Sequence, residues 1–572
     1  MKKQWQILRP DPHSVDMLCR ELKCHPAIAA ILVNRHIDSA EKASRFIFTS
    51  LDQLSSPFSI KDMDAAVNRI LYALKHREKI LIFGDYDVDG ITATAILLEF
   101  FRFIGADVSY YIPHRIKEGY GLKRSQVLDV AYPNKVNLII TVDCGSSCYA
   151  AVAAAKDIGI DVIVTDHHII VDNGPSASAV VNPKRRDCNA GFDDLAGVGV
   201  AFYLLICLRK KLRDVNFWNN RTEPNLKKFC DLVALGTLAD MVPLVPENRV
   251  LVKTGIDVIR ANNRPGLDAL MEISGIDPIF VDGNDMVFRL SPRLNSAGRL
   301  DHASIAVELL TTKKTEAAHQ MVRSLDNMNQ KRQRIENDIF IQIERHLYKN
   351  SHLFEKNTWV LVDETWHLGI LGIVATRLTR KYFRPVVLIT LMNGTGKGSA
   401  RSTPGVNLYD ALLACVDDLE TFGGHAKAAG LEIKPENIES FKIHLERAVN
   451  RMTTPEDFTP KIIIDYELHF TDISTGLIDQ IETLKPFGNG NNEPLFVARN
   501  VNVISSKIVG HHHRRMRLSQ SVGKSQTVFN AIQFNVDPHA SATEHFDQMA
   551  FKLRWNHWNG EKIAQIIIEE PS

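Results

Sequence analysis

The chain has 572 residues, too many for one compact domain, so its length alone predicts three or four domains. Hydrophobic residues make up 45% of the sequence and charged residues 24%, which is typical of a folded protein and excludes a low-complexity chain. The 68 Lys and Arg nearly balance the 67 Asp and Glu, so any site for a polyanion must be a local cluster of cations.

The N-terminal residues lack the apolar core of a signal peptide, and no run of about 18 apolar residues occurs. We therefore expect a cytoplasmic protein with no membrane partner. The 8 cysteines are scattered without a CxxC pair, which predicts reduced thiols and disfavours a zinc ribbon.

Residues 1–70 are expected to be mostly helical and to lead into a catalytic domain at 71–314. From Lys79 onward, helical stretches alternate with short apolar runs, which lie at 80–83, 108–112, 138–140, 162–164 and 179–181. Such short runs, apolar on both faces, predict buried parallel strands in βαβ units. Further helices are expected at 196–213 and 226–260.

A long amphipathic helix is predicted from Thr315 to Tyr348, in a connecting segment at 315–350. It would span roughly 50 Å, and its polar middle at 329–334 is expected to be exposed. A second α/β domain follows at 351–455, with strands at 359–362 and 386–389 and glycine-rich turns at 394–398 and 423–424. The strand-rich segment 456–572 predicts an OB-fold β-barrel. The predicted fold class is thus α/β, with two α/β domains joined by a long helix, plus a C-terminal barrel.

Acidic and histidine residues follow four successive apolar segments of the first α/β domain. In chain order they are Asp85, Asp87, Asp89, Asp143, Asp166, His167, His168 and Asp240. Because the carboxyl ends of parallel strands share one edge of the sheet, we expect these side chains to converge. So many like charges require cations between them. Hard oxygen ligands with one or two imidazoles favour Mn²⁺ or Mg²⁺ over a thiolate-type zinc site.

Other interpretations explain less of this pattern. A single Asp after a strand is most often a turn former or a helix N-cap, and two adjacent histidines usually lie on the surface or pack in the core without a functional role. The D-x-D-x-D-G run is similar to a calcium-binding EF-hand loop. Calcium is rejected because Ile96 stands where a bidentate Glu belongs and the preceding segment is a strand. Without a metal, the pattern would require four independent coincidences.

The same segments resemble successive motifs of the DHH phosphoesterase superfamily, namely GDYDVDG at 84–90, VDCG at 142–145, DHH at 166–168 and ALGTLAD at 234–240. Other stretches resemble its RecJ branch, namely LAGVGVAF at 195–202, RLNSAGR at 293–299, WHLGI at 366–370, GGH at 423–425 and PFG at 486–488. Ser296 departs from the usual Ala. The resemblance implies a DHH catalytic domain, a DHH-associated domain at 351–455 and a single-stranded-DNA-specific 5′→3′ exonuclease of DNA repair and recombination.

The resemblance also implies two divalent ions, Mn²⁺ or Mg²⁺, with Asp143 shared between them. One ion would be held by Asp85 or Asp87 together with Asp143. The other would be held by Asp89, Asp143, His167 and Asp240. Such a pair can activate water for in-line attack on a phosphodiester, which releases a 5′-mononucleotide. Asp143 is thus expected to be catalytic, with His168 on the scissile phosphate and Asp166 orienting His167 or His168.

Residues that bind the strand are expected in several segments. The stretch Gly396–Ser402 is predicted to be a flexible phosphate-binding loop, but it is not a Walker A motif because Gly398 follows Lys397. The resemblance implies that Ser399 and Arg401 hold the 5′-terminal phosphate. Further candidates are Arg115, Arg293, Arg299 and His425, although each arginine alone is equally often a solvated surface residue.

In the predicted barrel, the segment His511–Arg517 is expected to be a basic hairpin that follows a DNA backbone, since adjacent histidines on a strand alternate faces. Trp555 and Trp558 either stack on bases or pack the barrel. The resemblance implies single-stranded DNA as substrate, with single-strand-binding protein and a RecQ-type helicase as partners. A monomer suits an enzyme that threads one strand.

Two rival functions can be compared with this one. Another DHH phosphoesterase would cleave short oligoribonucleotides, cyclic dinucleotides or pyrophosphate, but those proteins are generally smaller and lack the terminal barrel. A non-catalytic DNA-binding scaffold would have lost several metal carboxylates, whereas all of them are present in this sequence.

Overall fold

The computed structural model describes residues 3–170, 172–261, 264–510, 512–522, 525–537, 543–558 and 561–571. The chain divides into two compact units. The first unit contains residues 55–242 and 254–460, and the second contains residues 3–54, 243–253 and 461–572. Within the described residues, no helix combines the length and apolarity needed to cross a bilayer.

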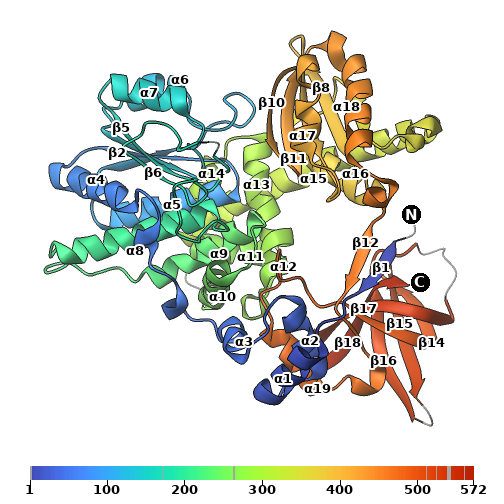
Figure 1. Cartoon of the computed structure of the whole chain (residues 1–572). Coiled ribbons are helices and arrows are strands. Elements are labelled where there is room, and N and C mark those ends of the chain that lie inside the picture. Colours follow the sequence, from blue (N-terminus) through green and yellow to red (C-terminus); the bar gives the residue numbers. More distant parts are fainter. Residues whose placement is uncertain are drawn as a thin grey trace. The chain divides into compact units, whose positions relative to one another are not determined.

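The first unit contains a five-stranded parallel sheet with the strand order β3-β2-β4-β5-β6 (Figure 1). Its strands are β2 (Ile80–Gly84), β3 (Val108–Tyr111), β4 (Leu138–Val142), β5 (Asp161–Thr165) and β6 (Ala179–Val181). β2 and β4 are buried along their whole length, as their mainly apolar sequences predict. The prediction of a parallel α/β domain is confirmed.

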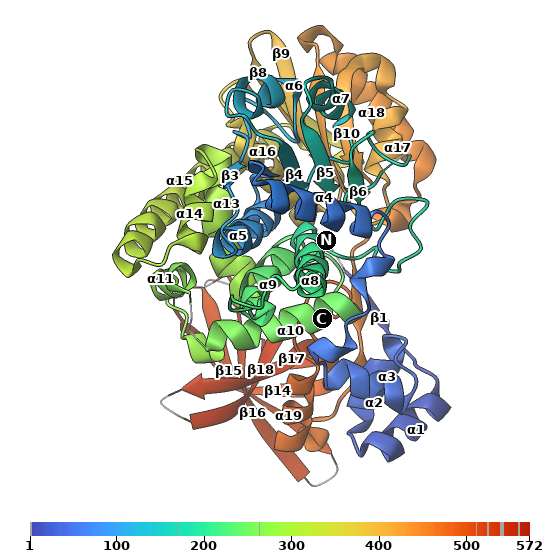
Figure 2. The same cartoon turned by 90° about the vertical axis from the view of Figure 1, so that its left-hand side faces the viewer.

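Helices cover both faces of this sheet. One face carries α4 (Met63–His76), α5 (Val88–Phe103) and α8 (Gly197–Asp214), and the other carries α6 (Arg124–Gln126) and α7 (Tyr149–Asp157) (Figures 1 and 2). The chain runs from β2 outward to β3 and then returns past β2 to β4, so the strand order reverses between β2 and β4. In sheets of this kind, ligands bind at the carboxyl ends of the strands beside such a reversal.

Further helices complete the first domain and lead to the second. They are α9 (Cys230–Ala239), α11 (Pro265–Ile273), α12 (Gly283–Asp285), α13 (Ser291–Leu300), α14 (Ser304–Thr311) and the 35-residue α15 (Thr315–Lys349). α15 coincides with the predicted long helix. Its polar middle is not fully exposed as expected, because Asn329 and Arg332 are buried. Arg332 donates to Glu336 at 2.7 Å and to Asn329, which satisfies these polar groups away from water.

The second sheet of this unit has the order β10-β11-β9-β8-β7, with β7 and β8 parallel and the other pairs antiparallel. Its strands are β7 (Trp359–Val362), β8 (Val386–Met392), β9 (Thr395–Arg401), β10 (Leu419–His425) and β11 (Ala428–Ile433). One apolar core packs this sheet against α15 and α16 (Leu368–Tyr382). A separate core packs it against α17 (Leu408–Leu413) and α18 (Ile438–Met452).

Two glycine-rich segments predicted as a loop and turns are strands. Residues 395–401 form β9, which is hydrogen-bonded to β8 on one side and β11 on the other. Gly423 and Gly424 lie within β10. Hydrogen bonds to the neighbouring strands hold both segments in extended conformation, which their glycine content alone does not predict.

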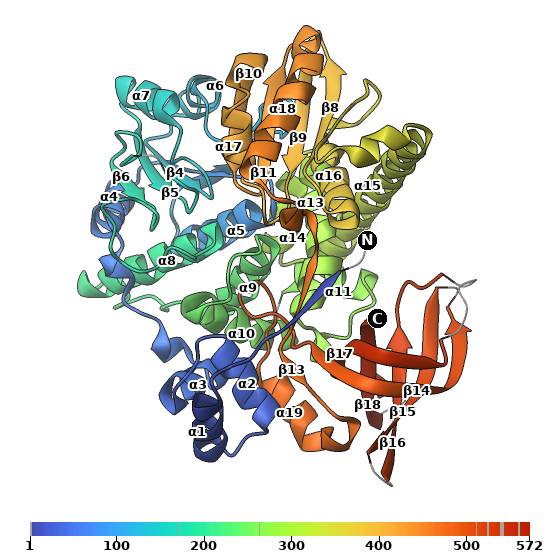
Figure 3. The ribbon, with the colours of Figure 1, turned by 45° about the vertical axis from the view of Figure 1, so that its right-hand side comes forward.

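The second unit contains a closed five-stranded barrel (Figure 3). Its strands are β14 (Phe496–Val509), β15 (His513–Val522), β16 (Ser525–Gln533), β17 (His545–Trp558) and β18 (Glu561–Pro571). β14 pairs with both β15 and β17, and β16 pairs in parallel with β18, which closes the barrel. This is the OB-fold predicted for the C-terminal segment.

Residues 3–54 belong to the same unit as the barrel. The helices α1 (Pro12–Leu22), α2 (Pro26–Asn34) and α3 (Ala40–Ile47) share one apolar core with the barrel and α19 (Thr475–Thr483). Within a segment predicted to be mostly helical, β1 (Gln4–Ile7) is a strand, because β12 (Lys461–Ile464) supplies its parallel partner. The short β13 (Tyr466–Glu467) pairs with β14, and α10 (Pro246–Arg260) begins in this unit and ends in the first.

Candidate metal centre and phosphate site

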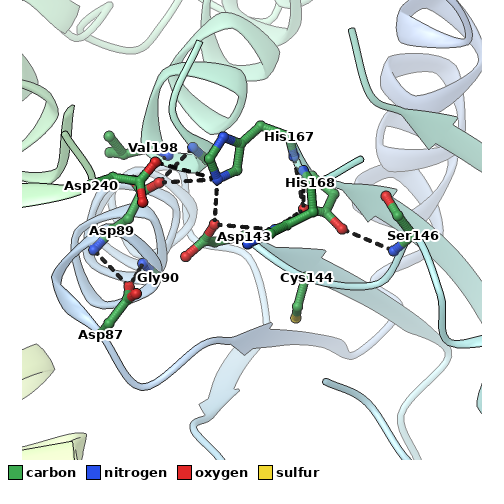
Figure 4. A network of polar contacts seen from close by, with 12 residues as sticks. Asp87, Asp89, Gly90, Asp143, Cys144, Ser146, His167, His168, Val198 and Asp240 are labelled. Carbon is green, nitrogen blue, oxygen red and sulfur yellow. Dashed lines mark hydrogen bonds and ion pairs between the residues drawn. The ribbon is translucent and has the colours of Figure 1, made fainter. Parts of the chain in front are cut away.

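Acidic and imidazole side chains meet at the carboxyl edge of the parallel sheet, where the strand order reverses (Figure 4). They follow β2, β4, β5 and α9, and they are the eight predicted residues Asp85, Asp87, Asp89, Asp143, Asp166, His167, His168 and Asp240. Asp87 is the N-cap of α5, and its carboxylate accepts from the backbone N–H groups of Asp89 and Gly90. The cap thereby fixes Asp89 in the first turn of the helix.

Two groups of side chains lie beside Asp143, and a third joins Asp143 to both histidines. Ligand atoms in each group lie within 4.8 Å of one another, and the groups are Asp85, Asp87 and Asp143; Asp89, His167 and Asp240; and Asp143, His167 and His168. His167 Nε2 lies 3.1 Å from Asp143 Oδ1, 3.7 Å from Asp89 Oδ2 and 3.6 Å from Asp240 Oδ2. Asp143 thus contacts the second group as well as belonging to the first.

Several buried atoms of the cluster have no hydrogen-bond partner among the described residues, namely Asp85 Oδ1, Asp143 Oδ1 and both ring nitrogens of His167. Burial lowers the pKa of His167 to about 3, so its imidazole is neutral. With the proton on Nδ1, the Nε2 lone pair faces three carboxylates, which is unfavourable without a cation among them. The unpartnered atoms therefore form a donor set of the kind that can hold a metal ion.

The carboxylates also repel one another. Burial, reinforced by Asp87, raises the pKa of Asp85 well above its usual range and that of Asp89 to about 7. Burial, reinforced by Asp89, likewise raises the pKa of Asp143 and Asp240. Divalent cations would reverse these shifts and keep the carboxylates ionised. Oxygen ligands with one imidazole match Mn²⁺ or Mg²⁺.

The N-terminus of α8 also binds the Asp89 carboxylate. The backbone N–H groups of Gly197 and Val198 donate to its two carboxylate oxygens at 2.6 and 2.8 Å. A Cβ on Gly197 would lie 2.6 Å from Asp143 Oδ1, so only glycine lets the helix approach this closely. The positive end of the helix dipole favours the charge on Asp89.

His168 is held by Asp166, whose Oδ1 lies 2.8 Å from its Nδ1. Burial alone would lower the pKa of His168, but Asp166 outweighs it and raises the pKa to about 9. The His168 side chain is 48% exposed, whereas that of Asp166 is 1% exposed. The arrangement presents a protonated imidazole to solvent beside the carboxylate cluster.

Tyr120 belongs to this site and was not predicted from the sequence. Its hydroxyl donates to the backbone oxygen of Asp143 at 3.1 Å and lies 3.1 Å from His168 Nδ1. The available signal was its position between Gly119 and Gly121, in the segment that follows β3 at the same edge of the sheet.

A cavity of about 340 Å³ lies between Tyr86, the sequence neighbour of Asp85 and Asp87, and the second sheet of the first unit. Its lining includes Tyr86, Arg115, Ser399 and Arg401, and the Arg115 guanidinium lies 4.9 Å from the centre of the Tyr86 ring. Arg401 Nη1 donates to Ser399 Oγ at 3.1 Å. The structure therefore brings these three predicted phosphate-binding residues together.

Arginines gather around this cavity with few acids to neutralise them. Among the described residues, Arg299 and Arg401 form no ion pair with a carboxylate, and Arg299 Nη1 donates to the backbone oxygen of Gly369 at 3.2 Å. Burial, with repulsion from Arg115, lowers the pKa of Arg299 to about 9 and that of Arg401 to about 10. Buried and mutually repelling guanidinium groups favour a bound anion.

Two other predicted residues have different surroundings. His425 is exposed at the end of β10, and partial burial with the charge of Arg401 lowers its pKa. Arg293 pairs with Asp326 of α15 at 2.8 Å and donates to the backbone oxygen of Arg289. Arg293 does not line the cavity beside the cluster.

The predicted basic hairpin is formed by β14 and β15. Arg515 and Arg517 are exposed on one face of β15, and Arg514 is buried on the other, while His511 lies outside the described residues. Trp555 Nε1 donates to Asp479 of α19 at 2.9 Å, and Lys562 Nζ lies 4.3 Å from its ring centre. Trp555 thus contacts α19 and β18, and the side chain of Trp558 is outside the described part of the chain.

The sheet, the carboxylate–imidazole cluster and the barrel define a divalent-metal protein of the DHH class. The DHH family, N-terminal domain, matches residues 79–237, the DHHA1 domain matches 355–451 and the RecJ OB domain matches 464–570. The chain is 37% identical to the single-stranded-DNA-specific exonuclease RecJ of Salmonella typhimurium, over 100% of this chain and 99% of that protein. The chain belongs to the RecJ family.

Solved structures show the same fold. RecJ of Thermus thermophilus in complex with Mn²⁺ matches with a TM-score of 0.83 and 28% identity, covering 100% of this chain and 79% of that chain. The same protein in complex with Mg²⁺ matches with a TM-score of 0.75 and 27% identity, covering 99% of this chain and 78% of that chain. The α/β domains, the long helix and the terminal barrel are thus features that this chain shares with its relatives.

Proposed function

We propose that the chain is a single-stranded-DNA-specific 5′→3′ exonuclease of DNA repair and recombination, which hydrolyses phosphodiester bonds with two divalent ions and releases 5′-mononucleotides. Its cofactors are Mn²⁺ or Mg²⁺, the ions named for its solved relatives. The observation that carries this proposal is the buried, unpartnered carboxylate–imidazole cluster at the strand reversal of a RecJ-family chain.

The proposed metal ligands follow the two groups of side chains. Asp85 and Asp87 would hold one ion, and Asp89, His167 and Asp240 the other, with Asp143 shared by both. When bound, the ions supply Lewis acidity, which activates water at neutral pH and offsets charge on the phosphoryl oxygens. The N-terminus of α8 keeps Asp89 in place, and Tyr120 holds the backbone of Asp143.

His168 and Asp166 complete the proposed chemistry. His168 is protonated at neutral pH and exposed beside the cluster, so it can donate a hydrogen bond to a non-bridging oxygen of the scissile phosphate. Asp166 is the positioning residue, because it fixes the ring and stabilises the imidazolium. The leaving group is the 3′ oxygen of the terminal nucleotide.

The cavity beside the cluster is the proposed site of the 5′-terminal phosphate. Ser399, Arg401 and Arg115 line it and offer donors, and Arg299 reaches the backbone oxygen of Gly369 in its wall. His425 contributes at the rim. Arg293 remains a proposed contact further along the strand, although its present partner is Asp326. A 5′ phosphate held at one fixed distance from the cluster accounts for removal of one nucleotide at a time.

Functionally, we divide the chain into an N-terminal segment (1–70), a DHH catalytic domain (71–314), a connecting helix (315–350), a DHH-associated domain (351–455) and an OB-fold domain (456–572). The exposed Arg515 and Arg517 of β15 are the proposed track for a DNA backbone on the barrel. The RecJ OB domain favours this function over that of smaller DHH phosphoesterases. The retained metal carboxylates disfavour a non-catalytic scaffold.

Beyond single-stranded DNA, the proposed partners are single-strand-binding protein and a RecQ-type helicase, and we propose a cytoplasmic monomer with no membrane partner. These proposals rest on membership of the RecJ family. Co-purification with each candidate partner and light scattering of the purified chain would test them.

The proposed activity is tested with end-labelled single-stranded DNA and Mn²⁺ or Mg²⁺, beside duplex, 5′-blocked and 3′-blocked strands. We expect mononucleotides from strands with a free 5′ end and none with EDTA. Single strands that are bound but never cleaved would indicate a scaffold. Cleavage restricted to very short oligomers or cyclic dinucleotides would support the proposed metal site but show that single-stranded DNA is not the substrate.

A further inference from the structure

A second cavity of about 360 Å³ adjoins the proposed 5′-phosphate site. It shares Gly372 and Arg401 with the first cavity, and its other charged lining residues are Arg299, Glu336, Arg377 and Arg380. All of these residues lie in the first unit, on α13, α15, α16 and β9. Its volume is within the range of small-ligand sites.

The charges of this second cavity suit an anion. Four arginines line it against one acid, Glu336, which is already paired with Arg332 at 2.7 Å and Arg377 at 3.6 Å. Arg380 is exposed on α16 and, like Arg299 and Arg401, forms no ion pair with any described residue. The cavity therefore holds positive charge that the described part of the protein does not neutralise.

Gly372 lines both cavities and lies close to the residues proposed to hold the 5′ phosphate. A Cβ at this position would lie 2.8 Å from Arg401 Nη2 and 3.0 Å from Ser399 Oγ. A side chain here would press on the residues proposed to hold the 5′ phosphate. Because glycine has no side chain, a group attached to that phosphate can continue past it.

The two cavities lie in a definite order from the metal cluster. The first includes Tyr86, the sequence neighbour of Asp85 and Asp87, whereas the lining of the second includes neither Tyr86 nor a residue of the cluster. Arg401 lines both, so a phosphate bound to it borders the cavity that Tyr86 lines and the cavity that Arg380 lines. The strand leads toward the cluster, so an anion in the second cavity belongs to whatever extends beyond the 5′-terminal phosphate.

We propose that the second cavity binds the β- and γ-phosphates of a 5′-triphosphorylated strand end, an inference that rests on the proposed exonuclease function. Cleavage then releases a nucleoside 5′-triphosphate in the first turnover. Water adds to the phosphorus between the first and second nucleotides, the 3′ oxygen of the first nucleotide leaves with a proton, and the shortened strand keeps a 5′-monophosphate. The later turnovers release ordinary mononucleotides.

The test compares one oligodeoxynucleotide with a 5′-monophosphate or a 5′-triphosphate, using the full-length enzyme with Mn²⁺. The first product of the triphosphorylated strand should be a nucleoside triphosphate by mass spectrometry. Arg380→Ala should lower kcat/KM for the first turnover of that strand roughly tenfold, as loss of one charge-assisted contact predicts, and leave the monophosphorylated strand unaffected. Arg380→Lys should restore much of the difference.

Lys381→Ala is the matched control, because Lys381 lies on the same helix and pairs with Glu344 outside the cavity. The inference fails if the triphosphorylated strand is not cleaved or if its first product is a mononucleotide with pyrophosphate. It also fails if Arg380→Ala slows cleavage of both strands equally, since the second cavity would then contact the monophosphorylated strand as well. If the wild-type enzyme leaves even the monophosphorylated strand intact, the proposed function itself is wrong.

Discussion

The carboxylate of Asp166 lies 2.8 Å from Nδ1 of His168 and is itself fixed by backbone N–H groups of Ser146, His167 and His168. A buried acid with that many donors has one orientation, and it imposes one orientation on the exposed imidazole. In the proposed mechanism the two tasks are therefore separate, since Asp166 orients the imidazole ring and His168 contacts the substrate.

Asp166→Asn should lower kcat roughly 10- to 100-fold, because the amide oxygen can replace only one of the two accepting carboxylate oxygens and the neutral side chain no longer stabilises the imidazolium. Mn²⁺ affinity should change little, since Asp166 is not a proposed ligand. Steady-state digestion and Mn²⁺ titration would measure the two effects. Asp172→Asn, an exposed aspartate bonded to Tyr149, is the control. Equal activity of both variants would remove Asp166 from the mechanism.

Gly197→Ala should reduce activity roughly 100-fold, because the new Cβ would lie 2.6 Å from Asp143 Oδ1 and displace the shared ligand. Gly199→Ala, two residues along α8, meets only the flexible side chain of Leu195 at 3.1 Å and should be much milder. Initial rates at saturating Mn²⁺ would compare the two. If they behave alike, the close approach of α8 to Asp143 has no catalytic importance.

Arg401→Ala should raise KM for a 5′-phosphorylated strand at least tenfold and have a smaller effect on a 5′-hydroxyl strand, because the guanidinium is proposed to bind the terminal phosphate. Lys397→Ala on the same strand of the sheet is the control, since Lys397 is neutralised by Glu432 at 3.0 Å. Parallel kinetics on the two strands would show the difference. A uniform loss on both would place Arg401 elsewhere along the DNA.

Glu99→Gln should lower the thermal midpoint of the first unit at pH 7 by roughly 2–8 °C. Burial alone would raise the pKa of Glu99, but Arg264 at 2.9 Å and Lys313 at 2.8 Å hold it at about 2. Since the folded pKa is lowered, the stabilisation is present above the unfolded pKa of about 4.3 and is lost as the pH falls toward 2.

Thermal unfolding of the wild type and Glu99→Gln between pH 3 and pH 8 would test this linkage. The difference between their midpoints should shrink below about pH 4. The exposed Glu316 provides a control, as Glu316→Gln should have little effect at any pH. A difference that stays constant with pH would show that the charge of Glu99 contributes nothing.

The sequence predicts the parallel strands and the metal cluster well because both depend on local signals. Each buried strand is an apolar run, and each of the residues Asp85, Asp143 and Asp166 stands directly after one. The shared edge of a parallel sheet then brings together residues that lie far apart in the sequence. Asp240 follows an apolar helix and not a strand, and the same pattern of an apolar segment ending in an acid predicts it.

The remaining features depend on partners that no local pattern reveals. β1 is a strand because β12 pairs with it, and β9 is ordered because β8 and β11 flank it. Asn329 and Arg332 are buried in the polar middle of α15 because they bond to each other and to Glu336. Tyr120 was missed because only the folded loop brings its hydroxyl to Asp143 and His168.

Titration of Mn²⁺ into the wild type and Asp143→Asn tests whether two ions bind at the cluster and share Asp143. We expect two ions per wild-type chain. The variant should bind fewer and lose nuclease activity, while its thermal midpoint without metal should not fall, since the substituted amide would carry no buried charge. Two ions bound with unchanged affinity by the variant would contradict the sharing of Asp143 between two metal sites.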